Sequence, residues 1–447
     1  MNLEGKHVLV MGLARSGMAA IKVLTKLGAT VTLSEQKHKE DLPELPQLEE
    51  LGVTVVDQSL AVFQQPYDLC VKNPGIPYRS DKIQALEAQN IPVITEIELA
   101  FQVAKPQHYI AITGSNGKTT TSTLVYHILE KAYGKKVHLC GNIGIPLCEI
   151  VLKENLLEEE GHYIALEVSN FQLVNIDQFR PEVATIINLS PDHVDFMGSL
   201  ENYYKSKTEV YRNMKDNNLF VLNADDPLVK EYTEKYPVSC KVQTFSLDRQ
   251  DTDDYVKDGY VCVAGEPILP LDKIHIVGKH NLQNVMVAVA MARAAGVDKD
   301  TICAAVEAFH GVEHRMEFVR EWNGVKFYND SKGTNTDATV TALKAFDRGV
   351  ILLFGGFEKG LAMDDVKAHM GCVKKAIGFG VCGKRLVDDT VGADGIVVED
   401  LPAALAKAVE LAQPGDTVLL SPTTSSFDQY SCFEERGEHF KKLVNAL

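Results

Sequence analysis

Short apolar runs, each followed by a glycine turn and then by a helical pattern, occur three times along the chain. The first run is HVLVMG at residues 7–12, the second is HYIAIT from His108, and the third is GVILLF from Gly349. Alternating strand and helix signals are typical of parallel sheets covered on both faces. The pattern predicts an α/β protein with domain boundaries near Ile97 and Val312, where the periodicity lapses. The expected domains are residues 1–96, 97–311 and 312–447.

Further strands and helices are expected around these runs. In the first segment, ATVTLSE follows at the spacing of a βαβ unit. In the last segment, AIGFGVCG, GIVVED and DTVLLSP are expected to be strands and PAALAKAVELA a helix. A chain of 447 residues is also too long for one ordinary core, and its length alone suggests about three domains.

Composition and charge narrow the class of protein. With 45% hydrophobic and 24% charged residues, the chain has the composition of an ordinary soluble globular protein. Its net charge of −16 argues against a nucleic-acid or anionic-membrane partner, because such partners require basic patches. The nine cysteines include no CxxC pair, which favours reduced thiols. No secretory segment opens the chain, and no apolar run approaches the ~20 residues that span a bilayer. We expect a cytoplasmic protein.

The segment ITGSNGKTTT at Ile112–Thr121 has the features of a loop that holds a triphosphate. Glycines let the backbone wrap so that N–H groups point at phosphate oxygens, and the following helix adds its positive end. Lys118 would reach the outer phosphates and the Thr119 hydroxyl would ligate Mg²⁺. Ile112 replaces the first glycine of the strict G-x-x-x-x-G-K-[ST] pattern, so this is a shortened variant. The alternative is a tight turn that contains a lysine, and the position between a strand and a helix favours nucleotide binding. The loop residues are Gly114, Ser115, Asn116, Gly117, Lys118, Thr119 and Thr120.

A second glycine turn, GLARSG at Gly12–Gly17, gives a weaker signal. Ala14 stands where a dinucleotide fingerprint has its second glycine, and its side chain would obstruct a pyrophosphate. Glu35 ends the next strand and could bind a ribose, and the NPGI turn from Asn73 ends another strand near the same sheet edge. A nucleotide-type ligand and a plain turn without a ligand both remain open here.

Acidic, histidine and lysine side chains follow the phosphate loop. Glu167 ends the strand in YIALEVSNFQL, where P-loop proteins commonly place a carboxylate near magnesium. His193 follows the next strand, between Asp192 and Asp195, and residue chemistry leaves metal binding and a structural role equally open. Lys207 lies in the helical pattern ENYYKSKTEVYRNM, and by residue type alone it is a solvated lysine.

The motifs GSNGKTTT, GNIGIP, LEVSNFQL, DHVD, HNLQN, HRME, NDSKGTN and SFDQY resemble, in this order, those of the Mur ligases of peptidoglycan synthesis. The resemblance covers essentially the whole chain and is strongest to the branch that adds D-glutamate. It implies a Rossmann-like UDP-binding domain, a central P-loop ATPase domain with a parallel-rich sheet, and a C-terminal Rossmann-like domain. It also implies small-molecule partners, and we expect the protein to be a monomer.

The activity that the resemblance implies is an ATP-driven amide ligation. The γ-phosphate of ATP would pass to the alanyl carboxylate of UDP-N-acetylmuramoyl-L-alanine. The amine of D-glutamate would then expel phosphate through a tetrahedral intermediate. A carboxylate is a poor electrophile at neutral pH, whereas phosphate is a good leaving group. Because the reacting groups are anionic, such a site needs cations and tight positioning.

The resemblance also assigns roles to residues. Lys118, Glu167, His193 and Lys207 are the expected catalytic residues. Thr119 and Glu167 would hold one Mg²⁺, and Glu167 with His193 a second. Lys207 matches the family's carbamylated lysine, formed with CO₂, whose negative charge meets a metal. The other expected contacts are Arg15, Ser16, Asn73, Pro74, Gly75 and Asn142 for the UDP-substrate, Asn281, Arg315, Asp330 and Lys332 for ATP, and Thr334, Lys359, Ser426 and the backbone of Phe433 for D-glutamate. For the third-domain residues the alternative is a cap or loop role.

Two positions depart from the family pattern. The pair Ser34–Glu35 occupies the uracil-binding turn, where members often carry an aspartate. Glu358 replaces the aspartate of the common GGxDKG motif, although Lys359 is retained.

Other classes compete with this interpretation. A sister Mur ligase would add alanine, a diamino acid or a dipeptide, but the alanine-adding enzyme usually has histidine where this chain has Asn116, and the other two have a differently built first domain. Folylpolyglutamate synthase lacks this first domain. A nucleotide-dependent switch would need neither a second metal site nor an acidic-substrate pocket. A dehydrogenase would not need the phosphate loop, and Ala14 in place of a fingerprint glycine also argues against a dehydrogenase.

Overall fold

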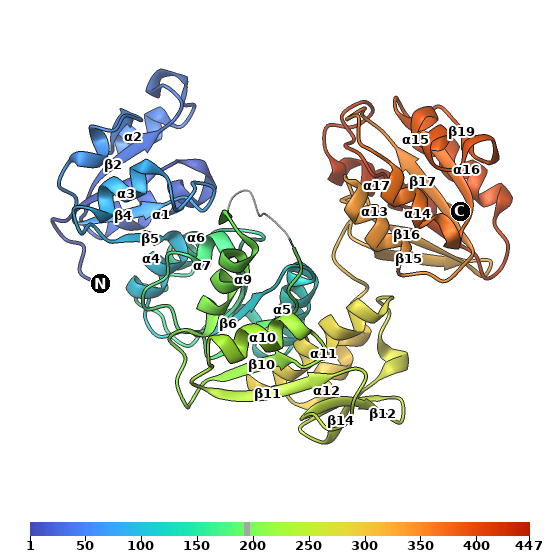
Figure 1. Cartoon of the computed structure of the whole chain (residues 1–447), viewed down its shortest axis with the longest axis horizontal. Coiled ribbons are helices and arrows are strands. Elements are labelled where there is room, and N and C mark those ends of the chain that lie inside the picture. Colours follow the sequence, from blue (N-terminus) through green and yellow to red (C-terminus); the bar gives the residue numbers. More distant parts are fainter. Residues whose placement is uncertain (192–196) are drawn as a thin grey trace. The chain divides into compact units, whose positions relative to one another are not determined.

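The computed structural model describes residues 1–191 and 197–447 (Figure 1). Within these residues the chain forms three sheets that are mostly parallel, which confirms the predicted α/β class. The described residues divide into two compact units, Met1–Leu271 with Gln283–Ala305, and Asp272–Leu282 with Val306–Leu447. The three domain ranges expected from the sequence stay predictions. None of the helices in the described ranges has the length and apolar character needed to cross a membrane.

The first sheet is covered by helices on both faces. It contains β1 (His7–Met11), β2 (Thr30–Glu35), β3 (Thr54–Asp57), β4 (Leu69–Lys72) and β5 (Val93–Thr95), in the order β3-β2-β1-β4-β5 with parallel neighbours. Its helices are α1 (Ala14–Lys26), α2 (Leu45–Glu50) and α3 (Asp81–Glu87). Val8 and Val10 of β1 pack in the cluster that includes α1, whereas Leu9 and Met11 pack with α3. Burial on both faces explains the continuous apolar run HVLVM.

The second sheet carries the phosphate loop. Its strands are β6 (His108–Thr113), β7 (Val137–Gly141), β8 (Tyr163–Glu167), β9 (Val183–Ile186), β10 (Leu219–Asn223), β11 (Lys241–Ser246), β12 (Asp254–Lys257), β13 (Tyr260–Val263) and β14 (Glu266–Pro270). Their order is β14-β13-β12-β11-β10-β9-β6-β8-β7, parallel from β7 to β12 and antiparallel beyond. The β12–β13 turn holds Asp258 and Gly259 at φ of +49° and +79°, which suits a tight hairpin.

The helices of this part follow the strand–helix alternation. They are α4 (Glu96–Val103), α5 (Lys118–Tyr133), α6 (Leu147–Lys153), α7 (Asn170–Leu173), α9 (Leu200–Thr208), α10 (Pro227–Lys235), α11 (Lys279–Ala294) and α12 (Lys299–Glu307). The segment predicted to be helical around ENYYKSK is α9, followed by a 3-10 turn at Glu209–Tyr211. The helices α1, α4 and α6 contact one another, so an apolar core continues from the first sheet to the second.

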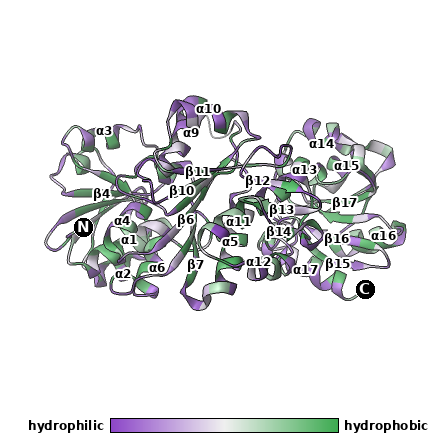
Figure 2. Ribbon diagram, turned by 90° about the horizontal axis from the view of Figure 1, so that it is seen from below, coloured by the Kyte–Doolittle hydropathy of each residue, from purple (hydrophilic) through white to green (hydrophobic). Residues whose placement is uncertain are grey.

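The third sheet is again covered on both faces. It contains β15 (Glu317–Trp322), β16 (Val325–Asn329), β17 (Val350–Gly355), β18 (Val373–Phe379), β19 (Ile396–Val397) and β20 (Thr417–Leu420), in the order β15-β16-β20-β17-β18-β19. Its helices are α13 (Thr336–Leu343), α14 (Asp364–Ala368), α15 (Gly383–Thr390), α16 (Leu401–Leu411) and α17 (Phe433–Asn445). Alternate residues of β17 face the α16–α17 cluster and the α13–α15 cluster, and Figure 2 shows the apolar strands between more polar helices. Only β15 runs antiparallel to its described neighbour.

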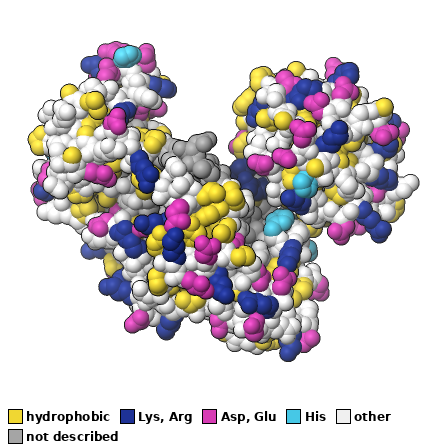
Figure 3. Space-filling model, viewed as in Figure 1, with side chains coloured by type: hydrophobic (Ala, Val, Ile, Leu, Met, Phe, Trp, Pro, Cys, Tyr) yellow, Lys and Arg dark blue, Asp and Glu magenta, His cyan; other side chains and the backbone are white. Residues whose placement is uncertain are grey.

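Sequence predictions for single elements hold with differences at their ends. ATVTLSE forms β2, AIGFGVCG contributes to β18 and PAALAKAVELA forms most of α16. The predicted strand GIVVED is ordered as a strand only at β19, so most of it is connection. On the face drawn in Figure 3, acidic and basic side chains are interspersed.

Candidate active site

The loop between β6 and α5 is shaped by glycines that other residues could not replace without strain. Gly114 has a φ of +149° and Gly117 a φ of +82°. A Cβ at Gly117 would collide with Oδ1 of Asn284 on α11. Because α5 begins at Lys118, its positive helix end lies directly at the loop. Asn284 was missed by the sequence analysis, although it stands in the HNLQN motif one turn after Asn281.

Two lysine side chains converge on the carbonyl of Gly114. Nζ of Lys118 donates hydrogen bonds to Gly114 O and Ser115 O, both at 2.9 Å. Nζ of Lys207 donates to the same Gly114 O at 2.9 Å and lies 4.6 Å from the centre of the Tyr203 ring. The side chain of Lys207 is only 1% exposed, so its interpretation as a solvated lysine is wrong. Two ammonium groups at one loop create a site that favours an anion.

The loop is also anchored to the segment that follows β9. Ser115 Oγ donates to Ser190 O at 3.0 Å, and the Asn116 N–H donates to Oδ1 of Asn188 at 2.8 Å. These bonds hold the loop in its shape before a ligand arrives, and one of them occupies the Asn116 N–H.

Glu167 ends β8 beside the loop, with an incomplete set of partners. In the sheet, it pairs with Ile112 of β6 and Gly141 of β7. Its carboxylate is buried, and Oε1 accepts a hydrogen bond from Nδ2 of Asn142 at 2.7 Å. Oε2 is buried without a hydrogen-bond partner among the described residues. A buried carboxylate oxygen of this kind is costly unless a cation or donor meets it, so the site fits a divalent metal.

The structure describes three of the four predicted metal ligands. Thr119 is half-buried on the first turn of α5, and Glu167 and Lys207 lie near the loop as described above. His193 lies outside the described residues, together with the neighbouring acids Asp192 and Asp195. The paired metal site therefore stays a prediction.

A cavity of about 500 Å³ lies at the carboxyl edge of the first sheet. The Glu35 carboxylate forms one wall, where Oε2 accepts a 2.6 Å hydrogen bond from Leu13 N and Oε1 one from Gln36 N. Asn73 and Gly75 lie on another wall. The cavity offers room for a ligand beside GLARSG, and ligand binding there stays a prediction.

The other residues predicted for the UDP-substrate do not line this cavity. Arg15 donates from Nη1 to Gly144 O at 2.7 Å, in the GNIGIP segment, and forms an exposed ion pair with Glu149. Ser16 Oγ accepts a 3.0 Å hydrogen bond from Nδ2 of Asn73. Pro74 follows in the same turn, and Asn142 contacts Glu167 instead.

Asp330 follows β16 and is buried inside the NDSKGTN segment. Its Oδ2 accepts a hydrogen bond from Ser421 Oγ at 2.8 Å and its Oδ1 one from Met316 N at 3.2 Å. Burial raises the pKa of its carboxyl to about 7, although the Ser421 hydrogen bond and the charge of Arg315 act in the opposite direction. A Cβ at Gly333 would collide with its Oδ2, so the glycine is required there.

Arg436 on α17 holds the same segment and was missed by the sequence analysis. Its guanidinium is fully buried, and it donates from Nε to Ser331 Oγ at 3.0 Å and from Nη2 to Ser331 O at 2.9 Å. It also donates to Thr424 O at 3.2 Å. Burial lowers its pKa to about 10. No motif signals such a role, because it depends on distant parts of the chain meeting at one point.

The structure brings together two of the residues predicted for D-glutamate. Nζ of Lys359 donates to Thr334 O at 3.1 Å, so these two residues are together. Ser426 is buried and its Oγ has no hydrogen-bond partner among the described residues. Phe433 begins α17, and its carbonyl accepts a 2.8 Å hydrogen bond from Ser331 Oγ.

The loop that carries Lys359 is fixed by an ion pair. Nε and Nη2 of Arg385 donate to Oε2 and Oε1 of Glu358 at 2.8 and 2.7 Å, and Nη1 donates to Leu361 O at 3.1 Å. The Arg385 hydrogen bond is the main cause that lowers the pKa of Glu358 to about 2. The Glu358 departure from the family motif therefore comes with a bidentate partner on α15.

The remaining predicted ATP contacts have defined positions. Nζ of Lys332 lies 5.8 Å from the centre of the Phe433 ring. Arg315 follows His314 in a backbone of positive φ (+62° at His314), and its N–H donates to Val312 O. Asn281 donates from Nδ2 to Val277 O at 2.7 Å.

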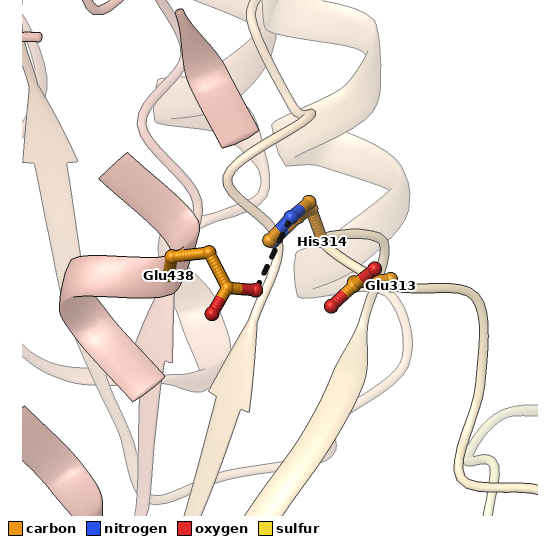
Figure 4. Close-up of side chains that lie close together, drawn as sticks. All are labelled: Glu313, His314 and Glu438. Atoms are coloured by element: carbon orange, nitrogen blue, oxygen red, sulfur yellow. Dashed lines mark ion pairs between the residues drawn. The ribbon is translucent and has the colours of Figure 1, made fainter. Parts of the chain in front are cut away.

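A cluster of Glu313, His314 and Glu438 has the composition of a metal site (Figure 4). The His314 ring points toward Glu438, with Nε2 3.9 Å from Oε1. The Lys441 ammonium already binds Glu313, and it lies 2.6 Å from Glu438 and 3.3 Å from Glu317. This one cation pairs with all three carboxylates, so the cluster is part of an ion-pair network.

Two segments of the chain match known families. Residues 112–292 match the Mur ligase middle domain, and residues 314–424 match the Mur ligase glutamate ligase domain. The solved structure of MurF from Acinetobacter baumannii is similar in fold, with a TM-score of 0.56 at 16% identity over 98% of this chain and 91% of that one. The chain belongs to the Mur ligase family.

Within the family, full-length relatives are more similar. The UDP-N-acetylmuramoylalanine–D-glutamate ligase of Geobacillus kaustophilus is 40% identical over 450 residues, covering 99% of this chain and 98% of the relative. The protein of the same name from Bacillus subtilis is 38% identical over 452 residues, covering 100% and 98%.

Proposed function

We propose that the chain ligates D-glutamate to UDP-N-acetylmuramoyl-L-alanine in an ATP-driven reaction that yields ADP and phosphate, in peptidoglycan precursor synthesis. The observation that carries the proposal is the full-length likeness, at about two residues in five, to relatives that bear this activity in their names. The phosphate loop and the orphaned Glu167 oxygen supply the chemistry that such a reaction needs.

The loop residues bind the triphosphate. The N–H groups from Gly117 through the first turn of α5 would donate to phosphate oxygens, because those of Ser115 and Asn116 already donate to Asn188. Lys118 bonds the loop carbonyls, and an arriving phosphate gives its ammonium a stronger, charged partner. The neighbouring Thr120 is buried in the same first turn of α5.

Magnesium fits the residues beside the loop. Glu167, Thr119, His193 and a carbamylated Lys207 would hold it, since each offers an oxygen or imidazole ligand. Bound magnesium would neutralise charge on the phosphate oxygens and on the substrate carboxylate. Asn142 would orient Glu167 through its hydrogen bond, so that the second carboxylate oxygen points to the ion. Carbamylation would convert Lys207 from a donor to Gly114 O into an anion.

The reaction then proceeds in two balanced steps. An oxygen of the alanyl carboxylate attacks the γ-phosphorus, and the bond to the leaving ADP oxygen breaks. The D-glutamate nitrogen attacks the acyl carbon and loses a proton, which gives a tetrahedral intermediate. This intermediate expels phosphate as the amide forms. Lys118 is the residue placed to stabilise the charge that moves onto the leaving phosphate oxygens. Exclusion of water is required, because water would otherwise hydrolyse the acyl phosphate.

The third-domain residues recognise the acidic amino acid. Lys359 provides a cation and the Ser426 hydroxyl an unused hydrogen-bond donor, which suit the carboxylates of D-glutamate. Thr334 lies against Lys359, and the Phe433 backbone is fixed by Ser331.

The amino-acid dependence of phosphate release tests the proposal. We expect release of ADP and phosphate only when UDP-N-acetylmuramoyl-L-alanine and D-glutamate are both present. Release with L-glutamate, alanine or lysine but not with D-glutamate would refute the substrate assignment. Lys118→Ala serves as the control that removes productive ATP binding.

A further inference from the structure

Lys72 is a buried lysine at the carboxyl end of β4, and the site described above does not use it. Its side chain is 1% exposed, and its backbone pairs with Met11 of β1 and Thr95 of β5. Nζ donates a hydrogen bond to Ile76 O at 2.9 Å and another to Asn73 O at 3.3 Å. Lys72 thus links the first and last residues of the NPGI turn through its ammonium group.

The positive charge of Lys72 has no carboxylate partner in an ion pair among the described residues. Burial lowers the pKa of its ammonium to about 8, and its titratable neighbour is the thiol of Cys70 on the same strand, whose own pKa burial raises. A buried, unpaired ammonium is costly, and an apolar side chain would fill the same space without this cost. The charge therefore calls for a functional explanation.

The turn that Lys72 supports forms a wall of the 500 Å³ cavity at the edge of the first sheet. Asn73, Gly75 and Ile76 line the cavity. The backbone carbonyls of Asn73 and Ile76 accept the two hydrogen bonds from Lys72. The glycine turn packs closely on the same wall, since a Cβ at Gly12 would lie 3.2 Å from Cβ of Asn73. The ammonium therefore lies behind the junction of the two turns.

We propose that Lys72 is a positioning residue that makes this cavity selective for a nucleoside diphosphate. Its hydrogen bonds hold the 73–76 turn, and its unpaired charge favours a phosphate-bearing ligand over the uncharged nucleoside. The inference rests on the proposed function, because the UDP part of the substrate is the expected occupant. A low local dielectric makes a charge near the cavity more effective than one on the surface.

The affinities of the full-length chain for UDP and for uridine distinguish two effects of Lys72, namely its positive charge and its hydrogen bonds to the 73–76 turn. Lys72→Met removes both the charge and the donor, whereas Lys72→Gln removes the charge and keeps an N–H donor. Lys26→Met removes an exposed charge from the end of α1 and is the matched control. Titration calorimetry measures UDP, ligand-observed NMR measures uridine, and thermal unfolding verifies that each variant is folded.

We expect the Kd for UDP to rise about tenfold in both Lys72 variants, while uridine binding changes less than twofold and Lys26→Met binds as the parent chain does. The inference would be overturned if Lys72→Met weakened UDP and uridine binding equally and Lys72→Gln restored both affinities. The hydrogen bonds to the 73–76 turn alone would then explain the effect. Unchanged UDP affinity would also overturn the inference. UDP binding by a parent chain that lacks D-glutamate-dependent phosphate release would contradict the proposed function but not this inference.

Discussion

The side-chain amide of Asn142 donates a 2.7 Å hydrogen bond to Oε1 of Glu167, and the other oxygen of that carboxylate is buried without a hydrogen-bond partner among the described residues. The bond fixes the carboxylate, and it leaves one oxygen oriented for a cation. Asn142 follows β7 and Glu167 ends β8, so neighbouring strands position the pair. The relationship explains how a residue predicted for the substrate also supports the predicted metal site.

Asn142→Ala should therefore weaken magnesium binding, so that turnover needs a higher magnesium concentration. The freed Glu167 side chain can rotate, so we expect the Mg²⁺ concentration for half-maximal activity to rise about tenfold or more. A magnesium titration of phosphate release measures this. An unchanged magnesium requirement with a raised KM for the UDP-substrate would assign Asn142 to substrate contact alone.

Lys207→Ala should lose at least about a hundredfold in turnover, because it removes the group that is carbamylated in the proposal. A short carboxylic acid such as acetate should restore part of the activity by taking the place of the carbamate. Lys205→Ala, at an exposed position on the same helix, is the matched control and should stay active. Full activity of Lys207→Ala, or loss without rescue at any acid concentration, would speak against the carbamate.

Glu358→Gln should raise the KM for D-glutamate and leave the KM for ATP unchanged. The substitution breaks the bidentate contact with Arg385 that holds the loop around Lys359. The double variant with Arg385→Ala should be no worse than the worse single variant, because both changes remove the same contact. Steady-state kinetics with each substrate varied in turn measures this. Additive losses in the double variant would indicate two independent roles.

The UDP affinity of the parent chain should fall as pH rises through about 8. The pKa of Lys72 is lowered to about 8 by burial, so the side chain is charged below this pH and neutral above it. Cys70 is the titratable neighbour that acts on it, and the buried thiol has a raised pKa. Lys72→Met should show a flat profile over the same range. A fall of equal size in Lys72→Met would assign the pH dependence to another group.

Local signals in the sequence predicted part of the candidate site. The phosphate loop, Glu167 at a strand end and the helix that holds Lys207 each depend on residues close in the chain, so pattern and spacing suffice to place them. The burial of Lys207 against the loop was not visible in its own segment, and only the family resemblance pointed to it. The hairpin at Asp258–Gly259 carried a tight-turn signal that the sequence analysis did not use.

Residues whose role depends on distant contacts were not predictable in this way. Asn284 meets Gly117, and Arg436 meets Ser331, across more than a hundred residues of sequence in each case. In the sequence, Lys72 looks like any lysine in a short strand. Its burial behind a cavity wall becomes visible only in the fold. Such contacts are created by packing, which local propensity does not encode.

The transfer of carboxylate oxygen to phosphate tests the central claim most directly. UDP-N-acetylmuramoyl-L-alanine labelled with ¹⁸O in both alanyl carboxylate oxygens is incubated with ATP, magnesium and D-glutamate, and mass spectrometry analyses the products. The account predicts one ¹⁸O in the released phosphate and one retained in the amide of the D-glutamyl product. Unlabelled phosphate with ADP formation would contradict it, because the γ-phosphate would then have passed to water and not to the carboxylate.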